Sequence, residues 1–124
     1  MKMRGLWVAL LVGVSAAASC DDSDGGGGAP GASGVASSKR IDSLTDAEKA
    51  LLCDWTNAKL GGYGGSVDCG GGFSLDADAS QAECVADWFT TCAATVAQGE
   101  ACANASTCAD PIPAACAPIA SCTR

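Results

Sequence analysis

The sequence predicts a small, mostly α-helical, disulfide-rich domain with three to four short helices and a short β-hairpin. Residues 41–124 contain eight of the nine cysteines of the chain. Such a density in a short chain is typical of an exported domain that is held together by disulfides. Helix-capping patterns precede three stretches of this region, and glycine clusters and prolines lie between them. These patterns predict short helices that are joined by turns.

The start of the chain has the composition of a secretory leader. Two basic residues, Lys2 and Arg4, precede an uncharged run over residues 5–16, which is shorter than the roughly 20 residues that span a bilayer. A basic start, a short apolar run and small residues before a cleavage point are typical of a signal peptide. We therefore expect residues 1–19 to be the signal peptide of a lipoprotein.

The end of this leader, Ala17-Ala18-Ser19-Cys20, resembles the lipobox of bacterial lipoproteins, in which small residues precede a cysteine that is diacylated on sulfur. Leu commonly stands three places before that cysteine, where this chain has Ala17. The chain has nine cysteines, so an even set of eight remains without Cys20. We expect Cys20 to be the site of lipidation. The alternative is an ordinary signal peptide that is cut near Ser19, with Cys20 in a disulfide.

Residues 20–40 are expected to be the acylated cysteine and a disordered tether. The stretch from Asp21 to Ser38 consists almost entirely of Asp, Gly, Ser, Ala and Pro. This composition cannot bury enough apolar surface to offset the entropy that is lost on ordering. We expect a cysteine-rich helical domain over residues 41–124.

The first helix of this domain is predicted by Thr45-Asp46-Ala47-Glu48. This stretch fits a capping box, in which the Thr45 hydroxyl accepts from the Glu48 N–H while Glu48 reaches back to Thr45. The helix is expected to run to about Leu60 and to end at Gly61-Gly62. Its predicted buried stripe consists of Leu51, Trp55 and Ala58, with Leu52 alongside.

The rest of the domain predicts a hairpin and three further helices. Residues 66–75 favour a hairpin that turns through Gly70 to Gly72. Residues 80–83 and 95–98 fit two more capping boxes, and the helix after the latter is expected to pass Cys102 toward Asn104. Residues 114–122 favour a last short helix. The helix that begins at residue 80 is expected to carry on one side Cys84, Val85, Trp88, Phe89 and Cys92.

The eight cysteines of the domain are expected to form four disulfides. They are Cys53, Cys69, Cys84, Cys92, Cys102, Cys108, Cys116 and Cys122. The connectivity cannot be deduced from the sequence. If Cys84 and Cys92 share one helix, they lie about 12 Å apart along its axis, so they cannot pair and instead tie that helix to other elements. Cys102 with Cys108, and Cys116 with Cys122, are plausible local closures.

Metal chemistry is disfavoured by the residue types. The chain has no histidine and no Cys-x-x-Cys pair, so neither a zinc site nor a thioredoxin-like redox motif is expected. Asp76, Asp78 and Ser80 match the first oxygens of a calcium loop, but Gln81 and Asp87 stand where that loop needs Gly and normally has Glu. These residues are better explained as a turn into the following helix. We expect no metal and no cofactor.

Catalysis and nucleic-acid binding find little support either. Without histidine there is no ordinary Ser-His or Cys-His pair, so no catalytic residue is assigned and no enzyme is expected. Asp68, Asp76 and Asp78 are close only in sequence. From Cys20 onward, 5 basic residues (7 minus Lys2 and Arg4) stand against 14 acidic ones. The resulting negative charge repels phosphate backbones, so no nucleic acid is expected as a partner.

The chain resembles small cysteine-rich bacterial lipoproteins. The resemblance is carried by the lipobox, the glycine-rich tether, Cys53-Asp54-Trp55 and Gly61-Gly62-Tyr63-Gly64. It implies a protein of the cell envelope that is anchored in the lipid bilayer through Cys20, facing the periplasm or the cell surface. The expected function is a structural or binding module with an envelope protein or glycan as partner. The alternative is a small exported enzyme or inhibitor that acts through an acidic cleft.

Overall fold

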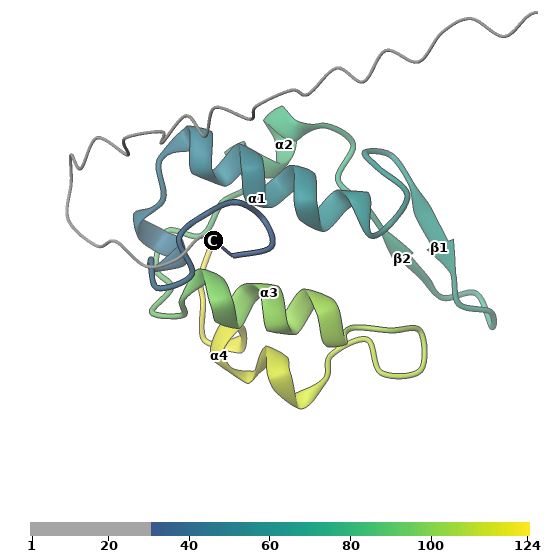
Figure 1. Cartoon of the computed structure of the whole chain (residues 1–124). Helices are drawn as coiled ribbons and strands as arrows, with labels where there is room; N and C mark the ends of the chain where they lie inside the picture. The colour runs from purple at the N-terminus through teal and green to yellow at the C-terminus, as the bar shows by residue number, and fades with distance from the viewer. Residues whose placement is uncertain (1–30) are drawn as a thin grey trace, which may run out of the picture.

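The computed structural model describes residues 31–124, in which four α-helices and one hairpin form two layers (Figure 1). The signal peptide, Cys20 and the first part of the tether lie outside the described residues. The elements are η1 (Ile41–Ser43), α1 (Asp46–Ala58), β1 (Ser66–Asp68), β2 (Ser74–Asp76), α2 (Gln81–Ala86), α3 (Val96–Ala105), η2 (Ala114–Cys116) and α4 (Ala117–Ala120). The predicted small disulfide-rich fold, with short helices and a hairpin, is confirmed at this level.

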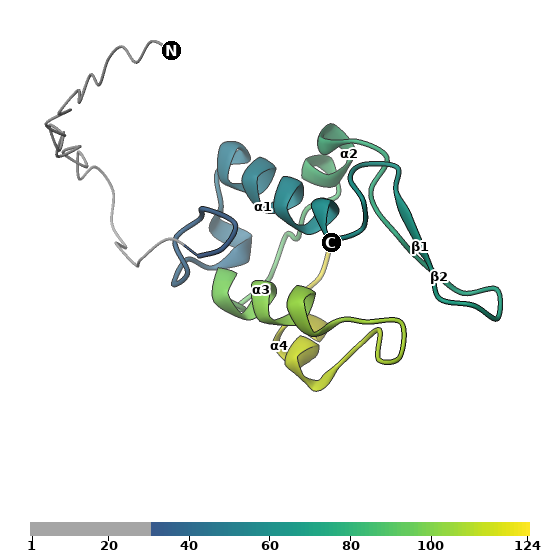
Figure 2. The same ribbon diagram turned by 45° about the vertical axis from the view of Figure 1, so that its right-hand side comes forward.

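The two layers meet in the core, where Leu52 of α1 packs in one cluster with Val96 of α3. Helices α1 and α2 form one layer, from which the hairpin projects, and α3 and α4 form the other (Figure 2). The last residues of the chain lie between them. No helix within residues 31–124 is long and apolar enough to cross a membrane.

Residues 31–40 differ from the tether that the sequence predicts at this place. Val35 is buried, and it packs with Leu44, Leu52 and Val96 in one of two core clusters. The Ser33 N–H donates to Glu100 at 2.8 Å, and the Ala32 N–H donates to the same carboxylate at 3.2 Å. The folded domain therefore begins before Ile41, and backbone hydrogen bonds from Val96 and Ala97 to Lys39 and Ser37 also hold this small-residue segment on α3.

Helix α1 starts as predicted but buries a different face. The Thr45 and Glu48 capping box is present, and the helix is followed by Gly61 and Gly62, which both have positive φ. The predicted stripe is wrong in part, since Leu51 is 47% exposed and Ala58 is exposed, whereas Trp55 packs against the core as predicted. The buried residues of the helix are Leu52, Cys53 and Asn57. The side of α1 that faces the core is therefore the one that carries the Cys53 disulfide and the hydrogen bonds of Asn57.

The hairpin has the predicted place and turn. Strands β1 and β2 pair antiparallel with Val67 opposite Leu75, and the turn residues Gly70 to Gly72 all have positive φ. An isolated two-stranded hairpin is marginally stable in water. Here the Ala77 N–H donates to the Gly65 carbonyl at 2.9 Å, which continues the pairing toward the helices.

Helix α2 is much shorter than predicted. The Ser80 hydroxyl accepts from the Glu83 N–H at 3.2 Å, but the return bond of a capping box is absent at this helix. The helix ends at Ala86, so Trp88 and Cys92 do not continue its face. The Trp88 indole instead donates to the Ile41 carbonyl at 2.8 Å, a buried polar contact that a continued helix does not provide.

The second layer forms largely as predicted. Helix α3 begins with the expected capping box of Thr95 and Gln98 and passes Cys102. The last helical segment is split into η2 and α4. Two isolated bridges, Arg40 with Thr95 and Thr91 with Thr123, hold the ends of this layer.

The eight cysteines form four disulfides, which join Cys53 to Cys84, Cys69 to Cys108, Cys92 to Cys122 and Cys102 to Cys116. Cys84 and Cys92 do not pair with each other, but the expected reason is wrong, since α2 ends at Ala86 and Cys92 lies beyond it. Both predicted local closures are wrong. Helix α3 packs on η2, which brings Cys102 to Cys116, and the loop that carries Cys108 lies against the hairpin, where Cys69 is the partner.

Candidate functional site

The most prominent hollow of the described region is a groove between the two layers, which we call the interlayer groove. It consists of two adjoining pockets, of about 230 Å³ and about 390 Å³. Thr56 of α1 and Ala103 of α3 line both pockets, so these two residues mark where the sections meet. We call the first the Trp88 section and the second the hairpin section.

The Trp88 section is lined mainly by apolar side chains from both layers. They include Ile41, Leu52, Trp88, Phe89, Ala103 and Ile119. The rings of Trp88 and Phe89 meet edge to face, with centroids 6.0 Å apart. Gly99 of α3 also lines this section, and the Ile41 side chain packs closely against it, since a Cβ at this position would lie 3.0 Å from Ile41 Cδ1.

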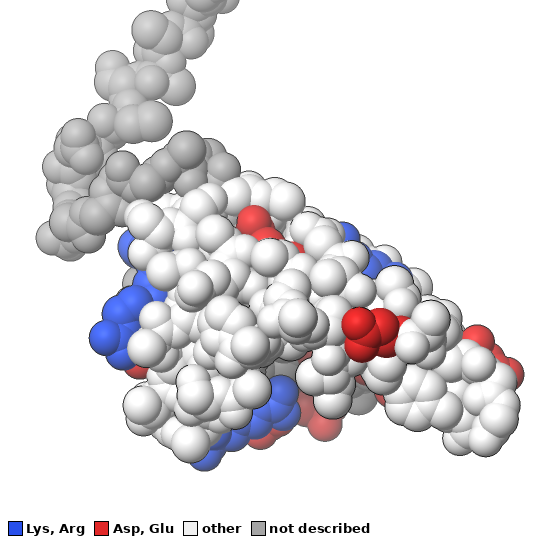
Figure 3. Space-filling view, turned by 90° about the horizontal axis from the view of Figure 1, so that it is seen from below, with Lys and Arg blue, Asp and Glu red and all other residues white. Residues whose placement is uncertain are grey.

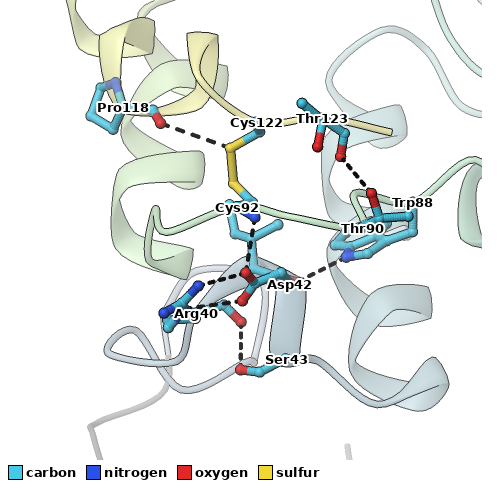
Figure 4. A network of polar contacts seen from close by, with 10 residues as sticks. Arg40, Asp42, Ser43, Trp88, Thr90, Cys92, Pro118, Cys122 and Thr123 are labelled. Atoms are coloured by element: carbon cyan, nitrogen blue, oxygen red, sulfur yellow. Dashed lines mark hydrogen bonds and ion pairs between the residues drawn. A yellow bond between two sulfur atoms is a disulfide. The ribbon is translucent and has the colours of Figure 1, made fainter.

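A polar network fixes the wall behind Trp88 (Figure 4). Asp42 accepts from the Arg40 guanidinium at 2.6 and 3.0 Å and from the Cys92 N–H at 2.9 Å. The Arg40 contact, followed by the Cys92 N–H, holds the pKa of Asp42 below its usual range. Cys92 is bonded to Cys122, so the network connects η1 to the end of the chain. This wall is therefore held by a covalent bond and by charge-assisted hydrogen bonds.

The mouth of the Trp88 section carries charged groups that already have partners. Arg124 pairs with Asp87, and its guanidinium lies 5.3 Å from the centroid of the Phe89 ring. Asp78 accepts from the Asn57 amide at 3.0 Å. These charges lie at the rim of an otherwise apolar section.

The hairpin section has apolar walls and one distinctive cation. Its apolar lining consists of Leu60, Val67, Leu75, Ala103 and Pro111. Lys59 lines the same section, and its ammonium lies 4.4 Å from the centroid of the Trp55 ring. This cation–π contact places the ammonium over a ring one helical turn earlier on α1.

Lys59 differs from the other basic side chains of residues 31–124. The other four each pair with a carboxylate: Lys39 with Glu48, Arg40 with Asp42, Lys49 with Asp46 and Arg124 with Asp87. Lys59 has no carboxylate within 4.0 Å in the part of the chain that the structure describes. Asp76, which lines the same section, accepts at 2.6 and 2.8 Å from the hydroxyls of Ser66 and Ser74.

The acids singled out by the sequence do not gather into one site. Asp68 accepts from the Gly70 N–H in the hairpin turn, whereas Asp76 and Asp78 line different sections of the groove. Within residues 31–124, no three His, Cys, Asp or Glu side chains come together as a metal site. Every carboxyl of these residues whose pKa departs from its usual value has a lowered one: Asp42, Glu48, Asp54, Asp76 and Glu100.

The two motifs that carry the family resemblance meet beside α1. Tyr63 donates to the Asp54 carboxylate at 2.7 Å, and the Gln81 amide donates to the same oxygen at 2.8 Å. Burial and then the Asp54 hydrogen bond raise the pKa of Tyr63 to about 12. This contact ties α1 to the loop after it and to α2, so its evident role is structural.

The surface of the second layer is nearly free of charge. Figure 3 shows this face, on which charged side chains are few and lie mostly toward the edges. Between Ala101 and Thr123 the only charged residue is Asp110, and Ile112 is 78% exposed. A surface of this kind fits contact with a weakly charged molecule better than contact with a strongly charged polymer.

The sequence did not reveal the groove-lining residues Thr56, Lys59, Gly99 and Ala103. Gly99 and Ala103 are four residues apart on one helix face, and this small-residue spacing was the available signal. This spacing predicts the wall of a groove only when the facing helix is known. No protein-family model, curated protein or solved structure matches this chain.

Proposed function

We propose that this chain is a lipid-anchored binding module of the bacterial cell envelope, which holds its ligand in the interlayer groove and catalyses no reaction. The anchor is assigned to Cys20 because its sequence context resembles a lipobox. The eight other cysteines pair among themselves, so none of the four disulfides needs Cys20. Disulfides persist in oxidising compartments outside the cytoplasm, which is consistent with an envelope location.

The observation that carries the binding role is a preformed apolar groove with covalently fixed walls. The Cys92–Cys122 bridge lies behind the Trp88 section, and Cys102 and Cys108, both in disulfides, line the two sections. Ligand sites are typically concave, mostly apolar and largely formed before binding. Walls that are already ordered lose little entropy when a ligand binds.

The alternative function, an exported enzyme or inhibitor with an acidic cleft, has less support. A general acid near neutral pH needs a carboxyl with a raised pKa, and the shifted carboxyls of residues 31–124 all have lowered ones. Asp78 and Asp87, which line the Trp88 section, are bonded to Asn57 and Arg124. The acids at the groove therefore act as acceptors within the fold.

The anchor is tested by the intact mass of the protein extracted from membranes. The protein with Cys20 is expected to exceed the calculated mass of its mature chain by a diacylglyceryl group, whereas the Cys20→Ala form lacks this addition. An unmodified mature chain that is released into the medium would contradict the lipid anchor.

The binding role is tested by native mass spectrometry of the mature chain with Cys20→Ser, exported behind a cleavable secretory leader. We expect a bound small molecule that is lost from Ala103→Phe, because the ring fills the point where the two sections meet. The matched control is Ala101→Phe on an exposed position of the same helix, which is expected to retain the molecule. Equal occupancy in both variants would contradict a ligand in the groove.

A further inference from the structure

We propose that the interlayer groove binds a single acyl chain, with an anionic head group beside Lys59 and the tail directed toward Trp88. This inference rests on the proposed function and names its ligand class. It is carried by the shape of the groove, by the polarity of its walls and by the position of one cation.

The shape of the groove favours an elongated ligand. Its two sections, of about 230 Å³ and about 390 Å³, share Thr56 and Ala103 in their linings. Typical small-molecule sites have volumes of roughly 300–1,000 Å³. A compact ligand would occupy one section and leave the other empty, whereas a flexible chain follows both.

Apolar side chains line both sections and favour contact with methylene groups. Leu60, Val67 and Leu75 line the hairpin section, and Leu52, Trp88 and Ile119 line the Trp88 section. Val67 is 37% exposed although it is a large apolar residue on a strand. A chain in the groove would cover this side chain, which the hairpin alone leaves in contact with water.

The position of Lys59 sets the direction of the ligand. Its ammonium is the only basic group of residues 31–124 without a carboxylate partner, and Lys59 is a lining residue of the hairpin section. Asp76, a carboxylate in the same section, does not pair with Lys59 and accepts hydrogen bonds from two hydroxyl groups. At the other end Arg124 is already paired with Asp87, so that end offers an anion no free cation. The head group is therefore assigned to the hairpin section.

The source of such a chain can be a free fatty acid or a lysophospholipid, since both combine one acyl chain with an anionic group. Both are compared by titration calorimetry on the exported mature chain with Cys20→Ser, which avoids detergent and bilayer. The probes are saturated fatty acids of 8, 10 and 12 carbons and a lysophosphatidic acid with a 12-carbon chain. We expect the affinity to rise about fourfold for each added methylene, because each one leaves water on binding. The tighter of the two 12-carbon probes identifies the head group.

The role of Lys59 is tested with Lys59→Gln, and its matched control is Lys49→Gln on the same helix. We expect Lys59→Gln to weaken binding of the 12-carbon acid about tenfold and to leave binding of dodecanol, which has no charge, unchanged. Lys49 pairs with Asp46 outside the groove, so Lys49→Gln is expected to bind both as the native protein does. Lys59 is exposed, and its replacement leaves the core intact.

Three results would overturn the inference: an affinity independent of chain length, equal effects of the two lysine variants, or a native affinity for the 12-carbon acid in Ala103→Phe. If the acyl probes fail to bind while native mass spectrometry still finds a ligand that Ala103→Phe loses, the ligand class is wrong and the binding role stands. If neither is found, both proposals fail.

Discussion

At the scale of single residues, a few buried polar groups position the chain around the groove. Asn57 is 3% exposed, and its amide donates to the Cys53 carbonyl and to the Asp78 carboxylate. Its side-chain oxygen accepts from the Asp78 N–H at 2.7 Å. One side chain therefore fastens the segment after the hairpin to α1.

Replacing Asn57 by Leu is expected to destabilise the domain by about 1–3 kcal/mol, because similar volume is kept while the Asp78 N–H and carboxylate lose their partner. Chemical denaturation of the exported protein measures this change. The matched control is Asn104→Leu on the exposed surface of α3, for which we expect a change below about 0.5 kcal/mol. Similar losses in the two variants would show that the Asn57 bonds contribute nothing specific.

Glu100 is a second buried polar residue and holds the first segment of the domain. Burial acts to raise its pKa, but hydrogen bonds from Ser33 and Ala32 outweigh burial and leave the pKa lowered. A lowered pKa means that the folded state favours the charged form. Its contribution to stability is therefore present above the unfolded-state value of about 4.3 and is lost as the pH falls through the folded-state value.

We expect the stability difference between the native protein and Glu100→Gln to be constant near neutral pH and to shrink below about pH 4. Because other carboxyls also titrate there, the difference between the two proteins is the informative quantity. It is measured by denaturation at a series of pH values. A difference that stays the same down to pH 3 would contradict the role of the charged carboxylate.

At the scale of elements, local signals set where the helices begin, and long-range contacts decide what they bury. The Thr45 and Thr95 capping boxes are present because such a box needs only four consecutive residues. The buried face of α1 was mispredicted because it depends on the distant partners Cys84 and Asp78. Helix α2 ends early for a similar reason, since Trp88 is drawn to the Ile41 carbonyl.

Two of the disulfides that join different elements differ in how deeply their cysteines are buried. The Cys53–Cys84 and Cys69–Cys108 bridges span similar separations of 31 and 39 residues, so their chain-entropy contributions are nearly equal, about 4 kcal/mol each. Cys53 is fully buried, whereas Cys108 is exposed. Replacement of both cysteines by Ala is therefore expected to cost more for Cys53–Cys84 than for Cys69–Cys108.

Thermal melts of the two double variants test this order. We also expect faster hydrogen exchange in the hairpin of the Cys69–Cys108 variant than in its α1, since the hairpin loses its covalent tie to the loop after α3. The opposite order of melting temperatures would show that burial of Cys53 adds nothing to its bridge.

At the scale of the whole molecule, two thin layers are held together by covalent bonds around small cores. The described core clusters contain few large side chains: Val35, Ile41, Leu44, Leu52 and Val96. The predicted set of four disulfides and the fold class follow from cysteine density and size. Pairing and the groove could not be predicted, because both depend on how α3 faces α1 and η2. The start of the domain was mispredicted because the Gly, Ser and Ala residues around Val35 do not reveal that this one valine is buried.

The central claim is that the four bridges fix the walls of the interlayer groove: Cys53–Cys84 lies within the first layer, Cys102–Cys116 lies within the second, and Cys69–Cys108 joins the hairpin to the loop after α3. The most direct test is to map the disulfides of the natively exported protein by mass spectrometry of peptides cut without reduction. We expect linked peptides that join Cys53 to Cys84, Cys69 to Cys108, Cys92 to Cys122 and Cys102 to Cys116. Local links of Cys102 to Cys108 or of Cys116 to Cys122, or two or more free thiols among these eight cysteines, would contradict the account.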